Sequence, residues 1–465
     1  MTPATRQLAL GFGSAVLTAA AALSGPALAA GLLATALGGF AVLGNTVLGA
    51  YLLVALAQLD GIALLVDQRL PISLFKAVTA LVLLSLVLTV RRHPLMQGRL
   101  RLSPTAMFTL LFAIWLCVSY LASDWQSYSY DHTKGFLQTL LLVPILGLTV
   151  TSPRHLRRMV LVIAASGAIS AVFVILETVF GLRLLPYADE GDVAAWLGAV
   201  RSAGASAYNP TTSSHLMAVS LMLALVLALY DWRGRRLWVL ISLLCLVALP
   251  MMGARSGAIA VAMGIGLIGF RMRHHRLFPV VALGALAALV VAVLNAPDTL
   301  VERFGVLGDF LGDGDTSDRS LLRRLSYNQI GLALWAEHPV TGLGPGAYPV
   351  NYASDAFRWY PGREAEARQL HNAYLEVAVE TGIVGIALFL GALLSAAWAA
   401  LKAGLHPVTE TQVLAQALGV AMAVFMFASL FMPNEDIKYT WILAALCARA
   451  AQLAGGWRVD TGQAA

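Results

Sequence analysis

Residues 159–181, MVLVIAASGAISAVFVILETVFG, indicate the fold class of this chain. The run is as long as the ~20 apolar residues that a helix needs to cross a bilayer, and Glu177 is its single charge. Comparable runs recur along nearly the whole chain of 465 residues, of which 59% are hydrophobic and 12% are charged, with a mean hydropathy of +0.76. A water-soluble domain carries about 25% charged residues. The sequence therefore predicts an all-α, polytopic membrane bundle.

The apolar runs set the expected number of membrane crossings. They lie at 7–24, 27–44, 46–66, 72–90, 105–123, 135–150, 159–181, 213–230, 237–253, 256–270, 277–296, 372–400, 412–432 and 438–456. The run at 46–66 contains Asp60 and fits a re-entrant or interfacial segment, so we expect about 12 crossings, within a range of 12 to 14. Residues 1–30 have the pattern of a secretory signal, but the residues that follow are equally apolar, which favours a retained first helix.

Arginines in the short connections predict the orientation in the membrane. Four groups alternate with the crossings: Arg91, Arg92, Arg99 and Arg101; Arg154, Arg157 and Arg158; Arg233, Arg235 and Arg236; and Arg271, Arg273 and Arg276. The positive-inside rule explains this pattern and the net charge of +6, so nucleic acid is not an expected partner. The pattern predicts cytoplasmic termini and an outer face formed by residues 124–134, 182–212, 254–255, 297–371 and 433–437.

We expect three parts: an N-terminal transmembrane bundle over residues 1–296, a long outer loop over 297–371, and C-terminal transmembrane helices with a cytoplasmic tail over 372–465. In the loop, apolar residues at helical spacing predict an amphipathic helix over 318–337 on the membrane surface. Asn209 followed by Pro210 predicts an N-cap and a helix that starts at 211.

Cys117, Cys245 and Cys447 each fall inside an apolar run, and the sequence has no CxxC motif or Cys/His cluster. Neither a disulfide framework nor a zinc site is therefore expected.

One histidine stands out among the four on the predicted outer face. His371 opens a membrane helix directly after the long polar loop, and Asn372, which follows it, is the second candidate catalytic residue. A titratable ring near lipid is costly and is suited to taking a proton from a hydroxyl group. His338 and His215 are the alternative bases, although His338 also fits a turn before Pro339 and His215 fits a hydrogen bond within the core.

Two outer-face arginines are candidates for binding an anion. Arg255 lies between two apolar runs with almost no loop, so it sits at membrane depth or at the interface, and Arg201 precedes the helix that Asn209 caps. A guanidinium group matches phosphate oxygens in a bidentate way and keeps its charge. The other interpretation of Arg255 is an arginine that extends to the interface and stabilises a hairpin. Arg319, Arg323 and Arg324 on the loop helix form a third group.

The sequence His371-Asn372, nine further residues and Gly382 resembles the signature of the bacterial O-antigen ligase and O-antigen polymerase superfamily. The resemblance spans roughly residues 200–385. It implies that His371 is the essential histidine, that Arg201 and Arg255 are arginines typical of the superfamily, and that Arg324 is the loop arginine. Its neighbour Arg323 is one residue away and stays an alternative.

The resemblance implies a metal-independent, GT-C-like glycosyltransferase without a cofactor in the inner membrane of a Gram-negative bacterium. It would move O-antigen polysaccharide en bloc from undecaprenyl diphosphate to lipid A–core on the periplasmic face. An O-antigen polymerase and a protein O-oligosaccharyltransferase would share this donor chemistry. A lipid or polysaccharide transporter is the alternative from another class, but the sequence shows few intramembrane charges and no inverted repeat with broken helices.

Aromatic residues in the outer loop have two interpretations. Tyr348, Tyr352, Trp359 and Tyr360 alternate with Arg358 and Arg363. They fit side chains that stack on sugar rings, and they fit equally an aromatic belt at the membrane interface.

Overall fold

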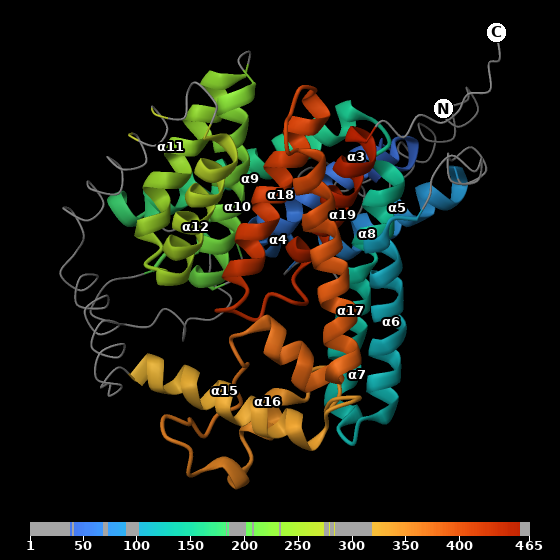
Figure 1. Ribbon diagram of the computed structural model, residues 1–465, viewed down its shortest axis with the longest axis vertical. Coiled ribbons are helices and arrows are strands. Elements are labelled where there is room, and N and C mark those ends of the chain that lie inside the picture. The colour runs from blue at the N-terminus through green and yellow to red at the C-terminus, as the bar shows by residue number, and fades with distance from the viewer. Residues whose placement is uncertain are drawn as a thin grey trace, which may run out of the picture.

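The computed structural model describes residues 38–39, 41–67, 73–89, 102–182, 184–185, 201–206, 209–231, 234–273, 279, 283 and 319–455. Every regular element in these ranges is helical, which confirms the all-α prediction (Figure 1). Five of the helices are long and apolar enough to cross a membrane. The predicted crossings at 7–24, 27–44 and 277–296 lie wholly or mostly outside the described residues, so the number of about 12 stays a prediction.

The first half of the described chain contains seven helices. They are α3 (Thr46–Gln58), α4 (Asp60–Asp67), α5 (Leu74–Thr89), α6 (Pro104–Ala122), α7 (Gln126–Leu140), α8 (Leu142–Thr149) and α9 (Pro153–Phe180). The apolar run at 46–66 is broken at Leu59, next to Asp60, whose carboxylate accepts a hydrogen bond from Ser206 Oγ at 3.3 Å. Residues 124–134, predicted to lie on the outer face, are mostly helical, because α7 starts at Gln126 and includes most of this polar stretch.

The second half contains α10 (Pro210–Tyr230), α11 (Arg235–Met251), α12 (Arg255–Met272), α15 (Arg319–Glu337), the short α16 (Tyr348–Tyr352), a 3-10 turn η2 (Asp355–Phe357), α17 (Ala373–Ala403), α18 (Glu410–Ala428) and α19 (Lys438–Ala454). The predicted amphipathic loop helix is confirmed by α15. Gly382 (φ 69°, ψ −172°) kinks α17 and divides it into a short first segment and a long apolar second segment.

Local sequence explains where three long helices begin. Ser103, Ser152 and Asn209 each accept a hydrogen bond from a backbone N–H of the first turn, and a proline follows each of them at the first helical position. The side-chain oxygen satisfies a donor that has no partner within the helix, and proline removes another. The N-cap that Asn209 was predicted to form is confirmed.

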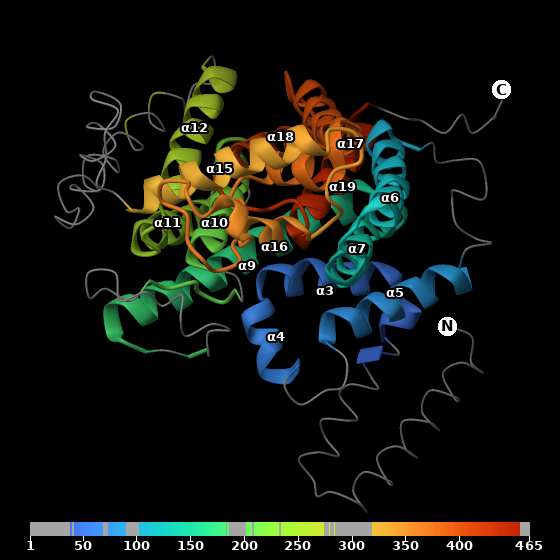
Figure 2. The ribbon, with the colours of Figure 1, turned by 90° about the horizontal axis from the view of Figure 1, so that it is seen from below.

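The helices form one main core and a smaller core under the outer loop. In the main core, α10 packs against α9, α11 and α18, while α17 packs against α6, α18 and α19. Figure 1 and Figure 2 show α17, α18 and α19 between the α10–α12 group and the α6–α7 pair. The smaller core joins α15, α16 and the start of α17 through Tyr327, Tyr348, Tyr352 and Leu370.

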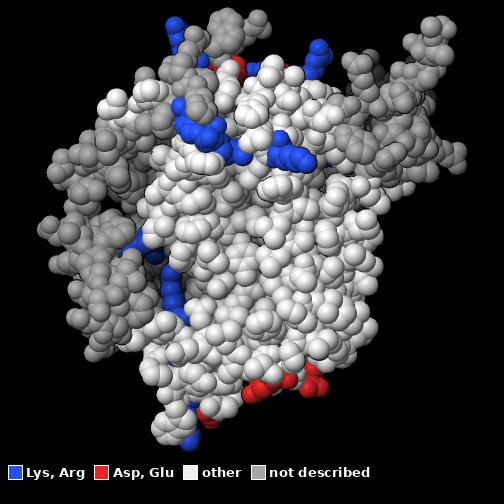
Figure 3. All heavy atoms as spheres, in the orientation of Figure 1, with Lys and Arg blue, Asp and Glu red and all other residues white. Residues whose placement is uncertain are grey.

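Contacts between distant segments define two ends of the molecule. At one end, Arg157 pairs with Asp231 at 2.8 Å and with Glu410 at 2.6 Å, which joins connections predicted to be cytoplasmic. At the other end, the hydroxyl of Ser123 donates to the carbonyl of Leu343 at 2.5 Å, which joins segments predicted to lie outside. Figure 3 shows basic side chains near the top of the molecule and a patch of acidic side chains on its lower edge.

Candidate active site

His371 lies between the outer loop and α17 on an unusual backbone. Its φ of 58° is the one positive value at a non-glycine residue in the described ranges. Such a conformation costs of order 1–3 kcal/mol and persists where the surroundings fix it. The N–H of Leu370 donates to Glu376 Oε2 at 3.2 Å, and the N–H of Ala373 donates to the carbonyl of Ser429 at 3.0 Å. The two bonds hold both sides of His371.

Asn372 forms the N-cap of α17. Its side-chain oxygen accepts from the N–H groups of Tyr374 at 3.2 Å and Leu375 at 3.3 Å. The contacts of Asn372 explain why the helix begins directly after His371. They give Asn372 a role in positioning, and its direct participation in chemistry stays a prediction.

The ring of His371 is partly buried, and one of its nitrogens has no hydrogen-bond partner among the described groups. It lies against the ring of Tyr327, with centroids 5.3 Å apart, and its Nδ1 is buried with no hydrogen-bond partner among the described groups. Burial, and then the charges of Arg324, Arg368 and Arg323, lowers the pKa of His371 to about 4. The ring is therefore neutral at physiological pH, as a proton acceptor must be.

Two of the three arginines predicted on α15 have described side chains. Arg324 lies close enough to act electrostatically on both His371, before α17, and His215, in the first turns of α10. Arg323 forms an ion pair with Glu364 at 2.8 Å, and Glu364 also pairs with Arg368 at 3.1 Å. The backbone of Arg319 begins α15, but its side chain lies outside the described residues.

The structure brings Arg201 to the turn before α12. Arg201 Nε donates to the carbonyl of Met252 at 3.1 Å, and Nη2 donates to Thr211 Oγ1 at 3.2 Å. Gly253 in this turn has a φ of +63°, and a Cβ there would lie 3.3 Å from Arg201 Nε. Arg255 is the first residue of α12, and Ala254 provides no side-chain cap. The guanidinium group of Arg201 thus contacts the turn that leads into α12, and a helix start without a side-chain cap favours an anion.

His215 lies one turn into α10 and is fully buried. Its Nε2 is 2.9 Å from Ser256 Oγ, and its Nδ1 is 3.1 Å from Asn434 Nδ2. Both ring nitrogens are engaged, so the geometry gives His215 a structural role between α10, α12 and residue 434. As an alternative base it would first have to break one of these bonds.

His338 and Tyr348 both make contacts that stabilise the outer loop. His338 follows α15 in the turn that ends it, where its carbonyl accepts from the N–H of Gly342 at 3.1 Å. Tyr348 is 0% exposed, and its hydroxyl donates to the carbonyl of Tyr327 at 2.9 Å. Burial also raises the pKa of Tyr348. The predicted stacking of Tyr348 on a sugar is corrected, because its ring faces are covered by the core of the loop.

The connection between α18 and α19 belongs to the site, although the sequence analysis assigned it no role. Ser429 holds Ala373, Asn434 holds His215, and Glu435 is 2% exposed with an Oε2 that has no partner among the described groups. Burial, and then the carboxyl groups of Glu376 and Asp436, raises the pKa of Glu435 well above its ordinary value. A polar Asn-Glu-Asp run between two apolar segments was the available signal.

Arg368 and Tyr327 are two further neighbours of His371 that the sequence analysis did not select. A basic residue three positions before His371 was a visible signal for the first, whereas nothing local pointed to Tyr327. Among the described residues, no group of three or more His, Cys, Asp or Glu side chains is arranged to hold a metal ion.

The geometry thus places a histidine nitrogen without a partner near the charges of Arg324, Arg323 and Arg368. Residues 240–390 match the O-antigen ligase family model. The match confirms the predicted resemblance, and it includes most of α11, all of α12 and α15, and the first part of α17, with Arg255, Arg324 and His371. Arg201 and the helices before α11 lie outside it. No curated protein matches the chain. The matched region is therefore similar to membrane enzymes of the O-antigen ligase and polymerase type.

Proposed function

We propose that this protein is a glycosyltransferase that moves an O-antigen polysaccharide from undecaprenyl diphosphate to lipid A–core. The reaction would take place on the periplasmic face of the inner membrane. The observation that carries the proposal is the unpartnered Nδ1 of His371, held on a constrained backbone beside Arg324. The family match over residues 240–390 supports the same class of reaction.

Arginines would bind the diphosphate of the donor. Arg201 and Arg255 flank the turn before α12, and Arg324 reaches the same region from α15. Guanidinium groups bind phosphate oxygens in pairs, and the start of α12 adds N–H donors. These groups would neutralise the charge that develops on the leaving diphosphate, which lowers the barrier to its departure.

His371 would accept the proton of the acceptor. The acceptor hydroxyl oxygen forms a bond to the anomeric carbon of the donor sugar, the bond from that carbon to the diphosphate oxygen breaks, and the hydroxyl proton passes to His371. Undecaprenyl diphosphate leaves with the bonding electron pair. A bound diphosphate also offsets the arginine charges, which raises the proton affinity of His371 when the donor is in place.

A reconstituted reaction tests the function. The purified protein in lipid vesicles is supplied with undecaprenyl-diphosphate-linked polysaccharide and purified lipid A–core, and the product is the polysaccharide joined to the core. We expect transfer that depends on both lipids. Elongation of the donor polysaccharide without lipid A–core would identify a polymerase, and transfer to a protein would identify an O-oligosaccharyltransferase. Movement of donor across the membrane without transfer would identify a transporter.

Thiol labelling tests the orientation. Starting from Cys117→Ser, which removes the exposed native thiol, single cysteines replace Asp355 in the outer loop or Arg273 after α12. In intact cells with a permeabilised outer membrane, an impermeant maleimide should label position 355 and spare position 273. Labelling of position 273 alone would reverse the orientation and move the site to the cytoplasm.

A further inference from the structure

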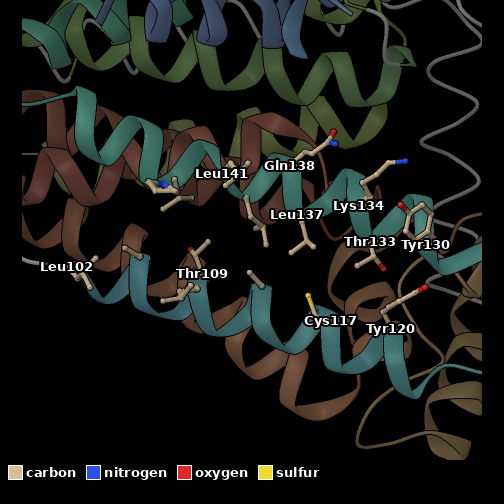
Figure 4. Close-up of a pocket in the computed structure, with 16 residues that line it drawn as sticks. Leu102, Thr109, Cys117, Tyr120, Tyr130, Thr133, Lys134, Leu137, Gln138 and Leu141 are labelled. Atoms are coloured by element: carbon tan, nitrogen blue, oxygen red, sulfur yellow. The ribbon is translucent and has the colours of Figure 1, made fainter. Parts of the chain in front are cut away.

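A groove between α6 and the α7–α8 pair forms a second candidate binding site. Its volume is about 690 Å3, and most of its lining is apolar (Figure 4). On α6 the lining residues Ala106, Thr109, Ala113 and Cys117 recur at helical spacing, so one face of the helix borders the groove. Their small side chains leave the space open. Leu137 and Leu141 line the opposite side.

The groove becomes polar at the end nearest the outer loop. Tyr120, Tyr130, Thr133 and Lys134 line this end, and Figure 4 shows all four grouped together. Thr133 is only 6% exposed, and its Oγ1 has no hydrogen-bond partner among the described groups. A buried hydroxyl without a partner costs free energy, which a ligand with polar atoms would recover.

The length of the groove suits a lipid. Its lining runs from Leu102 before α6 to Tyr120 near the end of that helix. At 1.5 Å per residue this distance is about 27 Å, close to the ~30 Å thickness of the hydrocarbon core. An apolar channel of this length, with hydroxyl and amine groups at one end, matches hydrocarbon chains that carry a polar headgroup.

The polar end of the groove connects to His371 through the outer loop. Ser119 on α6 donates to the carbonyl of Thr341 at 2.7 Å, and Ser123, directly after α6, donates to the carbonyl of Leu343 at 2.5 Å. Leu343 belongs to the same small core as Tyr327, whose ring lies against His371. A headgroup that leaves the groove at this end therefore meets the segment that carries His371.

The arginines of the site lie on the other side of the bundle. Arg201 and Arg255 belong to the α10–α12 group, which packs against α9, α11 and α18, whereas α6 packs against α7 and α17. Figure 1 and Figure 2 agree that α17–α19 separate the two groups. A lipid whose diphosphate is bound by these arginines starts on the α10–α12 side, so the α6–α7 groove is available to the second lipid substrate.

We propose that the α6–α7 groove binds the acyl chains of the acceptor glycolipid, with its sugar headgroup at Thr133 and Tyr130. This assignment rests on the proposed function for the identity of the acceptor. It makes the protein a two-sided enzyme, in which donor and acceptor lipids approach the outer loop from opposite sides of α17.

Cys117 provides a native probe of the groove. It is the exposed cysteine of the three, and it lines the groove, whereas Cys245 and Cys447 are buried. The protein in nanodiscs is treated with a long-chain alkyl maleimide, and modification is followed by mass spectrometry, with Cys117→Ser as the blank. We expect purified lipid A–core to slow modification of Cys117, and undecaprenyl diphosphate to leave the rate unchanged.

The outcomes separate the possible occupants. Protection by undecaprenyl diphosphate alone would assign the groove to the donor and overturn the proposal. Equal modification with and without lipid A–core would also overturn it, as would a thiol that the maleimide never reaches because a segment of the chain fills the groove. Protection of Cys117 by lipid A–core can also be measured in His371→Ala, because this measurement does not depend on turnover. Failure of the groove assignment is therefore distinguishable from failure of the proposed transfer reaction.

Substitutions give a second test. Ala113→Trp fills the groove and should raise the KM for lipid A–core by roughly tenfold or more while donor binding stays unchanged. Ile114→Trp, on the exposed neighbouring face of α6, is the matched control and should leave the KM unchanged. If Ala113→Trp does not fold, Thr133→Val should weaken acceptor binding roughly 3- to 10-fold, with Thr139→Val on the same helix as its control. A normal KM in a folded Thr133→Val protein, with Cys117 still unprotected by lipid A–core, rejects the groove as the acceptor site.

Discussion

His371 and His215 lie at the same end of the molecule, and the charge of Arg324 reaches both of them. Their surroundings differ in one decisive respect. Both nitrogens of His215 have partners in Ser256 and Asn434, on regular helix and in full burial. His371 has an unpartnered Nδ1, a positive φ and neighbours fixed by Glu376 and Ser429. Burial beside an arginine is therefore common to both histidines, and the unpartnered nitrogen on a constrained backbone is what singles out His371 as the proposed base.

The largest effect that would test this comparison is expected for His371→Ala. General-base catalysis is typically worth 10²–10⁴-fold, so transfer to lipid A–core should fall by about that factor. Donor binding to the purified variant should persist, because the arginines are intact. The lipopolysaccharide ladder in a ligase-null strain gives the cellular measurement. A full ladder from the variant would remove His371 from the mechanism.

Arg255→Lys tests whether this arginine binds the diphosphate of the donor. The substitution keeps the charge but loses the planar fork, and a charged hydrogen bond is worth about 1.5–3 kcal/mol, so transfer should fall roughly 10- to 100-fold. Arg201→Lys should act in the same direction, with an added loss of stability because Arg201 also holds the carbonyl of Met252. Arg273→Lys at the opposite end is the control. Wild-type transfer in the Arg201 and Arg255 variants would make both residues packing or topology residues.

The pH dependence should report the environment of His371. With its pKa lowered to about 4, the ring is neutral at higher pH, so kcat/KM should be flat near neutrality and fall roughly tenfold per pH unit below about 4. Arg324→Gln removes a charge that disfavours protonation, so the falling limb should move to higher pH. The pKa of His371 in the folded protein lies below its ordinary value of 6.5. Between about pH 6.5 and 4 the unfolded chain therefore binds a proton at His371 that the folded protein does not, and the free energy of unfolding decreases as the pH falls through this range. An unchanged pH profile in Arg324→Gln would separate Arg324 from the base.

His215→Ala should have the smallest effect on turnover. The change leaves Ser256 and Asn434 without their buried partner, which should lower the free energy of unfolding by about 1–3 kcal/mol. Turnover per folded molecule should stay close to that of the wild type, as measured by transfer normalised to the folded fraction in a thermal melt. If His215→Ala folds normally and loses transfer as completely as His371→Ala, the distinction between the two histidines fails.

Much of the fold could be predicted from the sequence because it depends on local patterns. Apolar runs located the long helices, Asn209 and Pro210 predicted where α10 begins, and helical spacing predicted α15. The same locality explains why the helical part of residues 124–134 was not anticipated. A polar stretch between two apolar runs is indistinguishable from a loop until its helix is seen to pack its buried face against α6.

The sequence by itself determined the membrane class, the positions of most of the described helices and the selection of His371, Arg201 and Arg255 as candidates, because hydropathy, capping and residue chemistry are read along the chain. Only the tertiary structure decided which of these residues meet. It brought Arg324 within reach of both histidines, covered the ring of Tyr348, engaged both nitrogens of His215 and opened the groove along α6. These outcomes depend on which helix faces pack together over long separations in sequence, and local spacing carries little of that information.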